Sequence, residues 1–498
     1  MKSLLQLNNL KFWPQSLVCI EQAEFGLVQT SAVPRLAILA ATGWPGLDDF
    51  DGEASEQDGQ TLLIGPTSPR NAAALRAHLD WLRPRLLGLR TSAGLGDRLG
   101  LATPGHVRAV RAAGGRIAPI FAQQSIREMT RTERTPQQVI DDALWGIFQE
   151  GWRSGFGADA DHLKTTADID ACIACGYTFF TIDPGDHVDN RADTASLSAL
   201  RAAVEHMPPD VQPRASGLLG RSFQIGGHAL TFDEATLFRA AAKYGRAVAY
   251  VAAMYQHLRQ AAGDRPFELE VSVDETDTPT TPAEHFYFAS ELRRLGVNWI
   301  SLAPRYVGRF EKGVDYISPD GKIGETGAFA ADFAIHAAIA RQLGSYKLSL
   351  HSGSDKFSVY AIAAEATQGL VHLKTAGTSY LEALRAVAAV APALFREIYA
   401  FARERYEADR VSYHVSARLD RAPLPDAMAE ADLPTLLDQF DSREILHIAF
   451  GSVLTARTAT GERRFHTRLM ELLRAHSERY AANLEAHFLR HLRPFEPR

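Results

Sequence analysis

The chain has 498 residues, of which 46% are hydrophobic and 22% are charged, and its formal net charge at pH 7 is −6. These values predict a large soluble core domain with additions, and the lack of a long basic run argues against nucleic acid as a main partner. No apolar run reaches the roughly 18 residues of a membrane span, and the N-terminus lacks the apolar core of a secretion signal. Three cysteines are too few for a disulfide framework, which indicates a reducing, cytoplasmic location.

Residues 1–85 are predicted to form a mixed α/β segment with a helix from Asn71 to about Arg83, to which no chemistry can be assigned. From residue 86 to residue 400, short apolar runs alternate with helical patterns. We interpret eight of these runs as strands, namely residues 86–89, 117–121, 156–160, 177–182, 269–273, 299–302, 348–350 and 370–373. This alternation predicts an α/β fold, a (β/α)8 TIM-type barrel over residues 86–400. An open doubly wound sheet is the competing interpretation, but no Gly-x-Gly-x-x-Gly turn supports a dinucleotide site.

Two stretches depart from this alternation. Residues 184–266, after the fourth predicted strand, form a helical insertion with predicted helices over 232–244 and 248–262. Insertions in such connections usually shape the substrate pocket. Residues 401–498 are predicted to be a C-terminal helical extension that ends in a long amphipathic helix over 464–489. This extension packs on the outside of the barrel or joins copies of the chain into a homo-oligomer.

The fifth predicted strand, within Phe267–Thr276, alternates strictly between apolar and polar residues. Its polar face carries carboxylates, among them Glu270. In a set of parallel strands this face would point into the barrel, where a buried carboxylate must be paired, metal-bound or protonated. A solvated edge strand is the alternative, and it is the commoner meaning of such a pattern taken alone.

The chemistry of a (β/α)8 barrel lies at the C-terminal ends of its strands. In this sequence nearly every predicted strand end offers a metal ligand or an acid/base group. From the third strand to the eighth these are Asp161 and His162; Asp183, Asp186 and His187; Glu270, Asp274 and Glu275; Arg305, Arg309 and Glu311; His351, Asp355 and Lys356; His372, Lys374 and Thr375. A scaffold protein has no reason to gather such groups at one rim, so the pattern favours an enzyme.

Two of these strand ends suggest specific chemistry. A neutral imidazole such as that of His162 suits Zn²⁺, Mn²⁺, Ni²⁺ or Co²⁺, and the adjacent Asp161 could take a hydroxyl proton. An N-cap aspartate beside a surface histidine is the alternative. The small residues after His351 let backbone N–H groups approach an anion, which Lys356 could help to neutralise, although a plain strand-to-helix turn gives the same pattern.

Two other features have simpler interpretations. His372 sits in the middle of an apolar run and is interpreted as a core histidine. Cys172 and Cys175 have the spacing of a redox pair, but they lie at the end of a helical pattern before a buried strand. We interpret them as two small core thiols, with a redox or zinc pair as the alternative.

Several segments together resemble known families. Asp161-His162, the strand from Glu268 to Val271 and the turn from Leu350 to Ser354 occur in the order seen in class II, metal-dependent aldolases. Over most of its length the chain is more similar to the tagaturonate epimerase family. The segments that carry this resemblance run from Gly94 to His106, from Gly155 to His162, from Glu311 to Tyr316 and from His351 to Phe357.

The aldolase resemblance implies Asp161 as proton acceptor and His162 and His351 as ligands of a divalent metal cation. Class II aldolases take a further histidine from the loop after the sixth strand, where this chain has none. Glu311 is the nearest ligand in that loop and is placed third.

Position and charge assign the remaining roles. Glu270 is the candidate for a second acid/base group, with Asp274 and Glu275 as rivals. Three residues are placed on the substrate carboxylate by their charge and position, namely Arg98, Lys356 and Thr375.

The epimerase resemblance implies an isomerase that interconverts D-tagaturonate and D-fructuronate in hexuronate catabolism, with the hexuronate ketose as its small-molecule partner. The two sugars differ at a carbon β to the ketone, whose C–H is not acidic enough for enolisation. Transient oxidation would need a nicotinamide site that the sequence does not offer, so retro-aldol cleavage and re-addition is the favoured route. The alternatives are a class II aldolase acting on a ketose or ketose phosphate, and a non-catalytic barrel that binds sugar acids.

Overall fold

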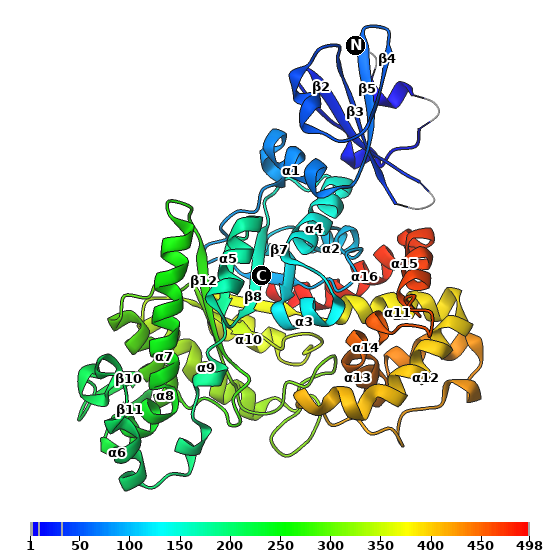
Figure 1. The fold of residues 1–498 in the computed structure, drawn as a ribbon. Coiled ribbons are helices and arrows are strands. Elements are labelled where there is room, and N and C mark those ends of the chain that lie inside the picture. Colours follow the sequence, from blue (N-terminus) through cyan, green and yellow to red (C-terminus); the bar gives the residue numbers. More distant parts are fainter. Residues whose placement is uncertain (1–2, 8–9, 31–32, 497–498) are drawn as a thin grey trace.

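The computed structural model describes residues 3–7, 10–30 and 33–496, and its centre is a closed barrel of eight parallel strands (Figure 1). The strands are β6 (Ser92–Leu95), β7 (Ala118–Ser125), β8 (Gly157–Leu163), β9 (Phe179–Ile182), β12 (Glu268–Val273), β13 (Ser301–Pro304), β14 (Lys347–Leu350) and β15 (Val371–Thr375). Pairing of β9 with β12 and of β15 with β6 closes the ring. The predicted (β/α)8 barrel is confirmed.

Helices follow each barrel strand along the chain. They are α2 (Thr103–Ala112), α3 (Ile126–Thr132), α4 (Pro136–Glu150), α5 (Thr166–Cys175), α7 (Glu234–Ala262), α8 (Pro282–Arg294), α9 (Gly327–Gln342), α10 (Tyr360–Thr367) and α11 (Thr378–Val390). Local sequence starts several of them. Ser125, Thr135, Thr165 and Thr281 each form a capping box, which satisfies two otherwise unpaired N–H groups at the first turn.

The first barrel strand lies at Ser92–Leu95, and the prediction of a strand over residues 86–89 is wrong. The N–H groups of Leu87 and Gly88 do not enter the sheet. They donate to the Glu268 carboxylate, at 3.0 Å and 2.5 Å, so the segment forms a turn under the barrel. The real strand contains no β-branched residue and shows no alternation, so its sequence carries little strand signal.

The N-terminal segment stands off one end of the barrel (Figure 1). It is an antiparallel sheet in the order β1-β2-β3-β5-β4, followed by one helix, α1 (Pro69–His78). The strands are β1 (Val18–Ile20), β2 (Ala23–Val28), β3 (Arg35–Ala41), β4 (Glu53–Gln57) and β5 (Gln60–Pro66). Asn71 joins helix and sheet, because its side chain accepts from Asp51 N at 2.7 Å and donates to Pro66 O at 2.8 Å.

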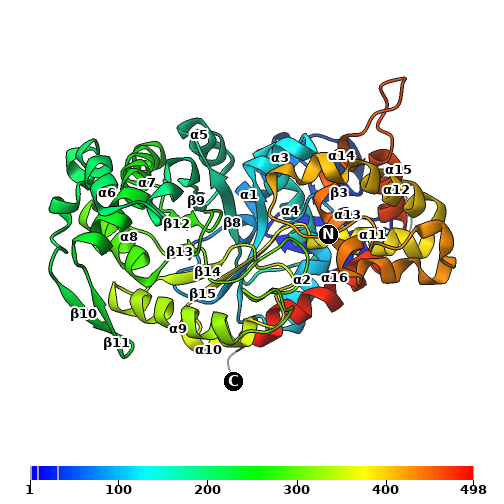
Figure 2. The same cartoon turned by 90° about the horizontal axis from the view of Figure 1, so that it is seen from below.

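The segment between β9 and β12 forms one flank of the molecule in Figure 2. It contains α6 (Leu197–Glu205), the hairpin β10 (Ser222–Ile225) and β11 (His228–Thr231), and then α7. The two predicted helices over 232–244 and 248–262 are a single helix of 29 residues. Gly245 lies within this helix and does not end it. Its lack of a side chain allows close packing, because a Cβ at this position would lie 2.0 Å from Met207 Cε.

The C-terminal helices form the opposite flank (Figure 2). They are α12 (Pro392–Asp409), α13 (Phe440–Ile448), α14 (Phe450–Thr455), α15 (His466–Ala475) and α16 (Ser477–Leu492). The predicted helix over 464–489 is two helices, which meet at His476 in a non-helical conformation. Helix α16 packs against α2 and α11, on the outside of the barrel.

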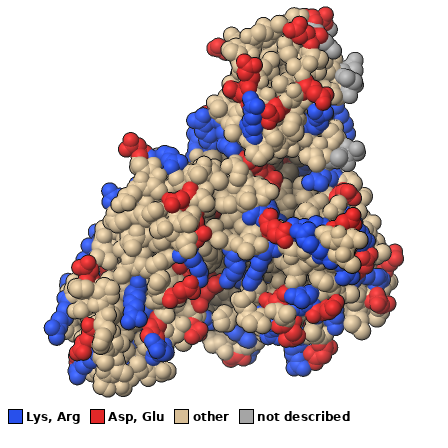
Figure 3. All heavy atoms as spheres, in the orientation of Figure 1, with Lys and Arg blue, Asp and Glu red and all other residues tan. Residues whose placement is uncertain are grey.

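The surface and the thiols bear on the predicted cellular setting. Within the described ranges, no helix has both the length and the apolar character needed to cross a bilayer. Basic and acidic side chains are interspersed over the face drawn in Figure 3. Cys19, Cys172 and Cys175 are free, and burial raises the pKa of the Cys172 and Cys175 thiols. A raised pKa disfavours the thiolate that redox or zinc chemistry would need.

The turn held by Glu268 gives a prediction about stability. The Glu268→Gln substitution removes the charge from two buried hydrogen bonds and is expected to lower the free energy of unfolding by about 1–2 kcal/mol. Urea unfolding followed by circular dichroism measures this change. The matched substitution Glu53→Gln, on the exposed strand β4, is expected to change it by less than about 0.5 kcal/mol. Equal effects of the two substitutions would contradict the role given to Glu268.

Candidate active site

The barrel interior is polar, with Lys374 of β15 at its centre. Its ammonium group lies 2.8 Å from Asp159 Oδ2, 2.7 Å from Asp161 Oδ1 and 2.8 Å from Glu270 Oε1. All four side chains are buried. The polar face of the fifth barrel strand therefore points into the barrel, as predicted, and its carboxylate is paired. Sequence reasoning noted Lys374 at a strand end but gave it no role.

The charges of this cluster depend on one another. Burial raises the pKa of Asp159 to about 7, although Lys374 opposes the shift. For Glu270, burial also raises the pKa, but Lys374 and His351 outweigh it and hold that pKa well below its usual range. Burial would lower the pKa of Lys374, but the three carboxylates raise it above its usual value. Lys374 is therefore an ammonium ion and not an amine nucleophile.

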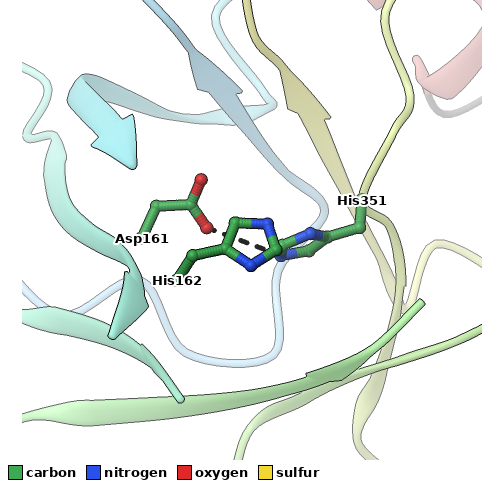
Figure 4. A group of neighbouring side chains, drawn as sticks. All are labelled: Asp161, His162 and His351. Atoms are coloured by element: carbon green, nitrogen blue, oxygen red, sulfur yellow. Dashed lines mark ion pairs between the residues drawn. The ribbon is translucent and has the colours of Figure 1, made fainter. Parts of the chain in front are cut away.

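Asp161 and His162 both point into the site because β8 changes register at its end. The pairing of β8 with β9 shifts between Ala160 and Leu163, and His162 adopts a left-handed conformation with φ of 53°. Adjacent residues on a regular strand would point to opposite faces. The irregular strand end instead brings both side chains to the barrel mouth, as Figure 4 shows.

His351 reaches the same point from the turn after β14 (Figure 4). Its Nε2 lies 3.0 Å from Glu270 Oε1 and 3.6 Å from Asp161 Oδ1, and its Nδ1 lies 3.4 Å from Asp274 Oδ1. The imidazole rings of His162 and His351 have centroids 4.6 Å apart. One ligand atom each from Asp161, His162 and His351 lie within 4.8 Å of one another.

These three side chains fit a divalent cation by their chemistry. One carboxylate and two imidazoles are a donor set that suits Zn²⁺, Mn²⁺, Ni²⁺ or Co²⁺. Asp183 Oδ2 lies 3.2 Å from His162 Nδ1, which leaves Nε2 for a ligand and is the second contact typical of metal-binding histidines. Glu270 Oε2 is buried and has no hydrogen-bond partner among the described residues, so it could serve as a further ligand.

The protonation of His162 agrees with this assignment. Burial would lower its pKa, but Asp161 and Asp183 raise it to about 10. Without a cation this imidazole therefore carries a proton at neutral pH. A metal ion bound to Nε2 would replace that proton as the positive partner of the two carboxylates.

A second group with similar composition is a structural contact. Asp355, His487 and His491 also lie within ligand distance of one another. However, Arg443 Nη2 lies 3.0 Å from Asp355 Oδ1, and His491 Nε2 already accepts the Asp355 N–H at 3.0 Å. The lone pair of His491 Nε2 is thus already used by a backbone N–H group, which does not fit a metal ligand. The group instead ties α16 to the loop after β14.

Glu311 is not brought into the triad, so the structure does not support its placement as third ligand. Its Oε2 accepts hydrogen bonds from Ser416 N at 2.8 Å and from Ser416 Oγ at 2.6 Å, and its Oε1 lies 3.3 Å from Arg309. The carboxylate is thus engaged by the segment after α12. No sequence pattern linked these distant residues.

The three residues placed on the substrate carboxylate are also engaged elsewhere. Arg98 lies 2.7 Å from Glu128 and stacks on Phe450. The Lys356 ammonium donates to three backbone carbonyls at 2.6–2.9 Å, and the Thr375 hydroxyl donates to a backbone carbonyl at 2.7 Å. These side chains hold loops and strands together, and the structure does not bring them to the triad.

A cavity of about 240 Å³ opens beside His351. It is lined by the ends of β12, β13 and β14 and by residues 412–414, which follow α12. Asp274, Glu275 and Arg305 are among its lining residues. No residue of 184–266 lines it, contrary to the expectation that the insertion shapes the pocket. The C-terminal extension takes this place, which the sequence did not indicate.

The central ammonium gives a second prediction. The Lys374→Met substitution leaves three buried carboxylates without their positive partner, and we expect a loss of about 3–5 kcal/mol in the free energy of unfolding. The double variant Lys374→Met/Asp159→Asn also lacks one of the carboxyl groups that Lys374 contacts, so its loss should be smaller than the sum of the two single losses. Urea unfolding of the four proteins of the cycle measures the coupling. Simple additivity of the two single effects would contradict it.

With this geometry established, comparisons with known proteins identify the family. A sequence model of the tagaturonate epimerase family matches residues 13–495. A tagaturonate/fructuronate epimerase from Thermotoga maritima is 43% identical over 459 residues, which cover 92% of this chain and 91% of that protein.

Solved structures agree with the sequence match. The native crystal structure of fructuronate-tagaturonate epimerase from Cohnella laeviribosi superposes with a TM-score of 0.91 at 38% identity, covering 99% of this chain and 97% of that one. A form of the same enzyme with two glycerol molecules gives a TM-score of 0.92. The chain belongs to the tagaturonate epimerase family, whose named members are isomerases.

Proposed function

We propose that this protein interconverts D-tagaturonate and D-fructuronate by retro-aldol cleavage and re-addition at a divalent metal site that contains His162 and His351, with Asp161 beside it. Family membership supports the substrate pair, because the 43% identical relative carries that activity in its name. The observation that carries the metal site is the convergence of two imidazoles and one carboxylate, distant in sequence, at the barrel mouth.

The reaction balances without an oxidant. Counted from the hydroxymethyl end, the ketone is at carbon 2 and the inverted centre is carbon 4. Loss of the proton from the carbon 4 hydroxyl lets the bond between carbons 3 and 4 break, which gives an enediolate and an aldehyde that carries the carboxylate. Half a turn of the aldehyde presents its other face. The bond then forms again, and the new alkoxide takes up a proton.

Asp161 is proposed as the group that accepts the hydroxyl proton. Gln123 Nε2 donates to its Oδ2 at 3.2 Å and Lys374 to its Oδ1 at 2.7 Å, so the carboxylate has a fixed orientation. Burial raises its pKa, but Lys374 and the two histidines outweigh this and hold the pKa below its usual range. Asp161 is therefore an ionised carboxylate, which is the form that can take up a proton.

For the second acid/base group the geometry favours Asp274 over the predicted Glu270. Glu270 is fully buried and its Oε1 is held by Lys374 and His351. Asp274 lines the cavity and lies 3.4 Å from His351 Nδ1, on the side of the ring away from Asp161. Glu275 also lines the cavity, but it forms two hydrogen bonds with Arg127.

A divalent cation, when bound, supplies Lewis acidity that polarises a carbonyl and stabilises negative charge next to it. The chain's own part is to hold the ligands. Asp183 orients His162, and Glu270 and Asp274 contact the two nitrogens of His351. We further propose a cytoplasmic location, which the three free thiols support.

Metal content tests the site. The His162→Ala variant is expected to lose bound metal and epimerase turnover together. Asp183→Asn keeps His162 but replaces the carboxylate that contacts its Nδ1 with a neutral amide. This variant is expected to weaken metal binding by about 10- to 100-fold. Metal analysis and competition with a chelator measure both effects. His206→Ala, an exposed histidine outside the site, is the control and should change neither; full metal content in His162→Ala would refute the site.

An isotope experiment tests the route. In D₂O, cleavage between carbons 3 and 4 keeps the hydrogen on carbon 4, because that hydrogen becomes the aldehyde hydrogen. We therefore expect the epimer formed from tagaturonate to carry no deuterium at carbon 4, and an aldehyde reagent to trap a three-carbon fragment. NMR and mass spectrometry measure both. Deuterium at carbon 4 would reject cleavage, and net accumulation of three-carbon products would indicate a lyase.

A further inference from the structure

The cavity beside His351 carries several positive side chains where the sixth barrel strand ends. Two of them are occupied: Arg309 lies 3.3 Å from Glu311, and Lys312 donates to Ser352 Oγ at 2.8 Å. Arg305 also lines the cavity. Within the described ranges, no residue forms an ion pair or a side-chain hydrogen bond with the guanidinium group of Arg305.

An unpaired guanidinium in this position is an unusual arrangement. Arg305 is half-buried, and its five N–H donors have no protein acceptor among the described residues. Burial lowers its pKa, and Asp274 and Asp277 only partly oppose this from beyond contact distance. An anion from outside the chain would supply the acceptors that these N–H donors lack.

The backbone of Arg305 is fixed on both sides. Its N–H donates to Thr280 Oγ1 at 3.1 Å, and its carbonyl accepts the Thr280 N–H at 2.8 Å. Tyr244 in turn hydrogen-bonds the Thr280 hydroxyl at 3.1 Å. The guanidinium is thus presented from a rigid strand end and not from a free loop, which is how a binding group keeps a productive geometry.

The position of Arg305 relates it to the reacting groups. Pro304 pairs with Val273, so the next residues, Arg305 and Asp274, stand side by side at the ends of β13 and β12. Asp274 contacts His351 at 3.4 Å. Arg305 and His351 therefore follow the neighbouring strands β13 and β14, and both line the same cavity.

We propose that Arg305 binds the carboxylate of the substrate and thereby selects hexuronates over neutral ketoses. This inference rests on the proposed function, since it names the subsite that the acid group of tagaturonate or fructuronate occupies. The planar fork of a guanidinium matches a carboxylate in a bidentate pair. A neutral ketose leaves the guanidinium unpaired when it covers the group from water, and an unpaired polar group in a binding site is a basis for rejection.

Three variants test the subsite. In Arg305→Met, which keeps the length of the side chain without its charge, the KM for tagaturonate is expected to rise about 10- to 100-fold with little change in kcat. Arg305→Lys keeps the charge but not the fork and is expected to give a smaller rise. Arg309→Met removes a nearby charge that already has a partner and should leave KM within about threefold of the wild-type value.

D-tagatose, which has the same carbon chain without the carboxylate, separates recognition from general damage. Its inhibition constant as a competitor is expected to stay the same or to fall in Arg305→Met, because the variant leaves no guanidinium unpaired beside the neutral ketose. A parallel loss of tagatose affinity would overturn the proposal. So would a tagaturonate KM within twofold of wild type in Arg305→Met, or an equal rise in Arg309→Met.

The test is independent of the reaction itself. Calorimetric titration with tagaturonate measures binding without turnover, so the loss of affinity in Arg305→Met can be measured even if the wild-type protein converts nothing. A wild-type protein that binds tagaturonate through Arg305 but does not epimerise it would refute the proposed function and leave the subsite standing. Bound metal and the unfolding midpoint, measured for each variant, confirm that the triad and the fold are intact.

Discussion

The charge balance inside the barrel constrains the rest of the structure. Moving an ion from water into a protein interior costs several kcal/mol, so three buried carboxylates need a positive partner that touches all of them. Lys374 is that partner, and it joins β15 to β8 through Asp161 and to β12 through Glu270. Because these strands lie on different sides of the ring, one ammonium group fixes the relative positions of the side chains from which the site is built. His351 then completes the arrangement by contacting Glu270.

The C-terminal extension depends on a second set of buried ionic contacts. His487 and Arg443, from α16 and α13, both contact Asp355 in the loop that carries His351. Ser416 holds Glu311, and the neighbouring residues 412–414 line the cavity. The extension is thus part of the site's support and wall. This explains why Glu311 and Asp355 are not free to act in the site: they attach the extension to the barrel.

The accuracy of prediction followed the strength of the local pattern. Seven of the barrel strands were placed correctly because buried parallel strands are apolar runs between amphipathic helices, a signal contained in short windows. The first strand, Ser92–Leu95, was missed because its small residues carry no such signal, and the apolar residues 86–89 were chosen in its place. The proximity of Asp161, His162 and His351 was predicted because polar residues at strand ends stand out in the sequence. The partners of Arg98 and Lys356 were not predicted, since whether a cation already has a partner depends on residues elsewhere in the sequence.

The sequence by itself determined the barrel, the family and the residue types at the barrel mouth, because these follow from periodicity and from short motifs. Only the tertiary structure decided which of the charged groups are satisfied by the protein and which are free to act. Arg98, Glu311 and Lys356 are engaged by partners that the chain brings from other segments, whereas Arg305 has none among the described residues. The difference arises because the burial and the pairing of a charged side chain depend on residues that are close in space but distant in the sequence.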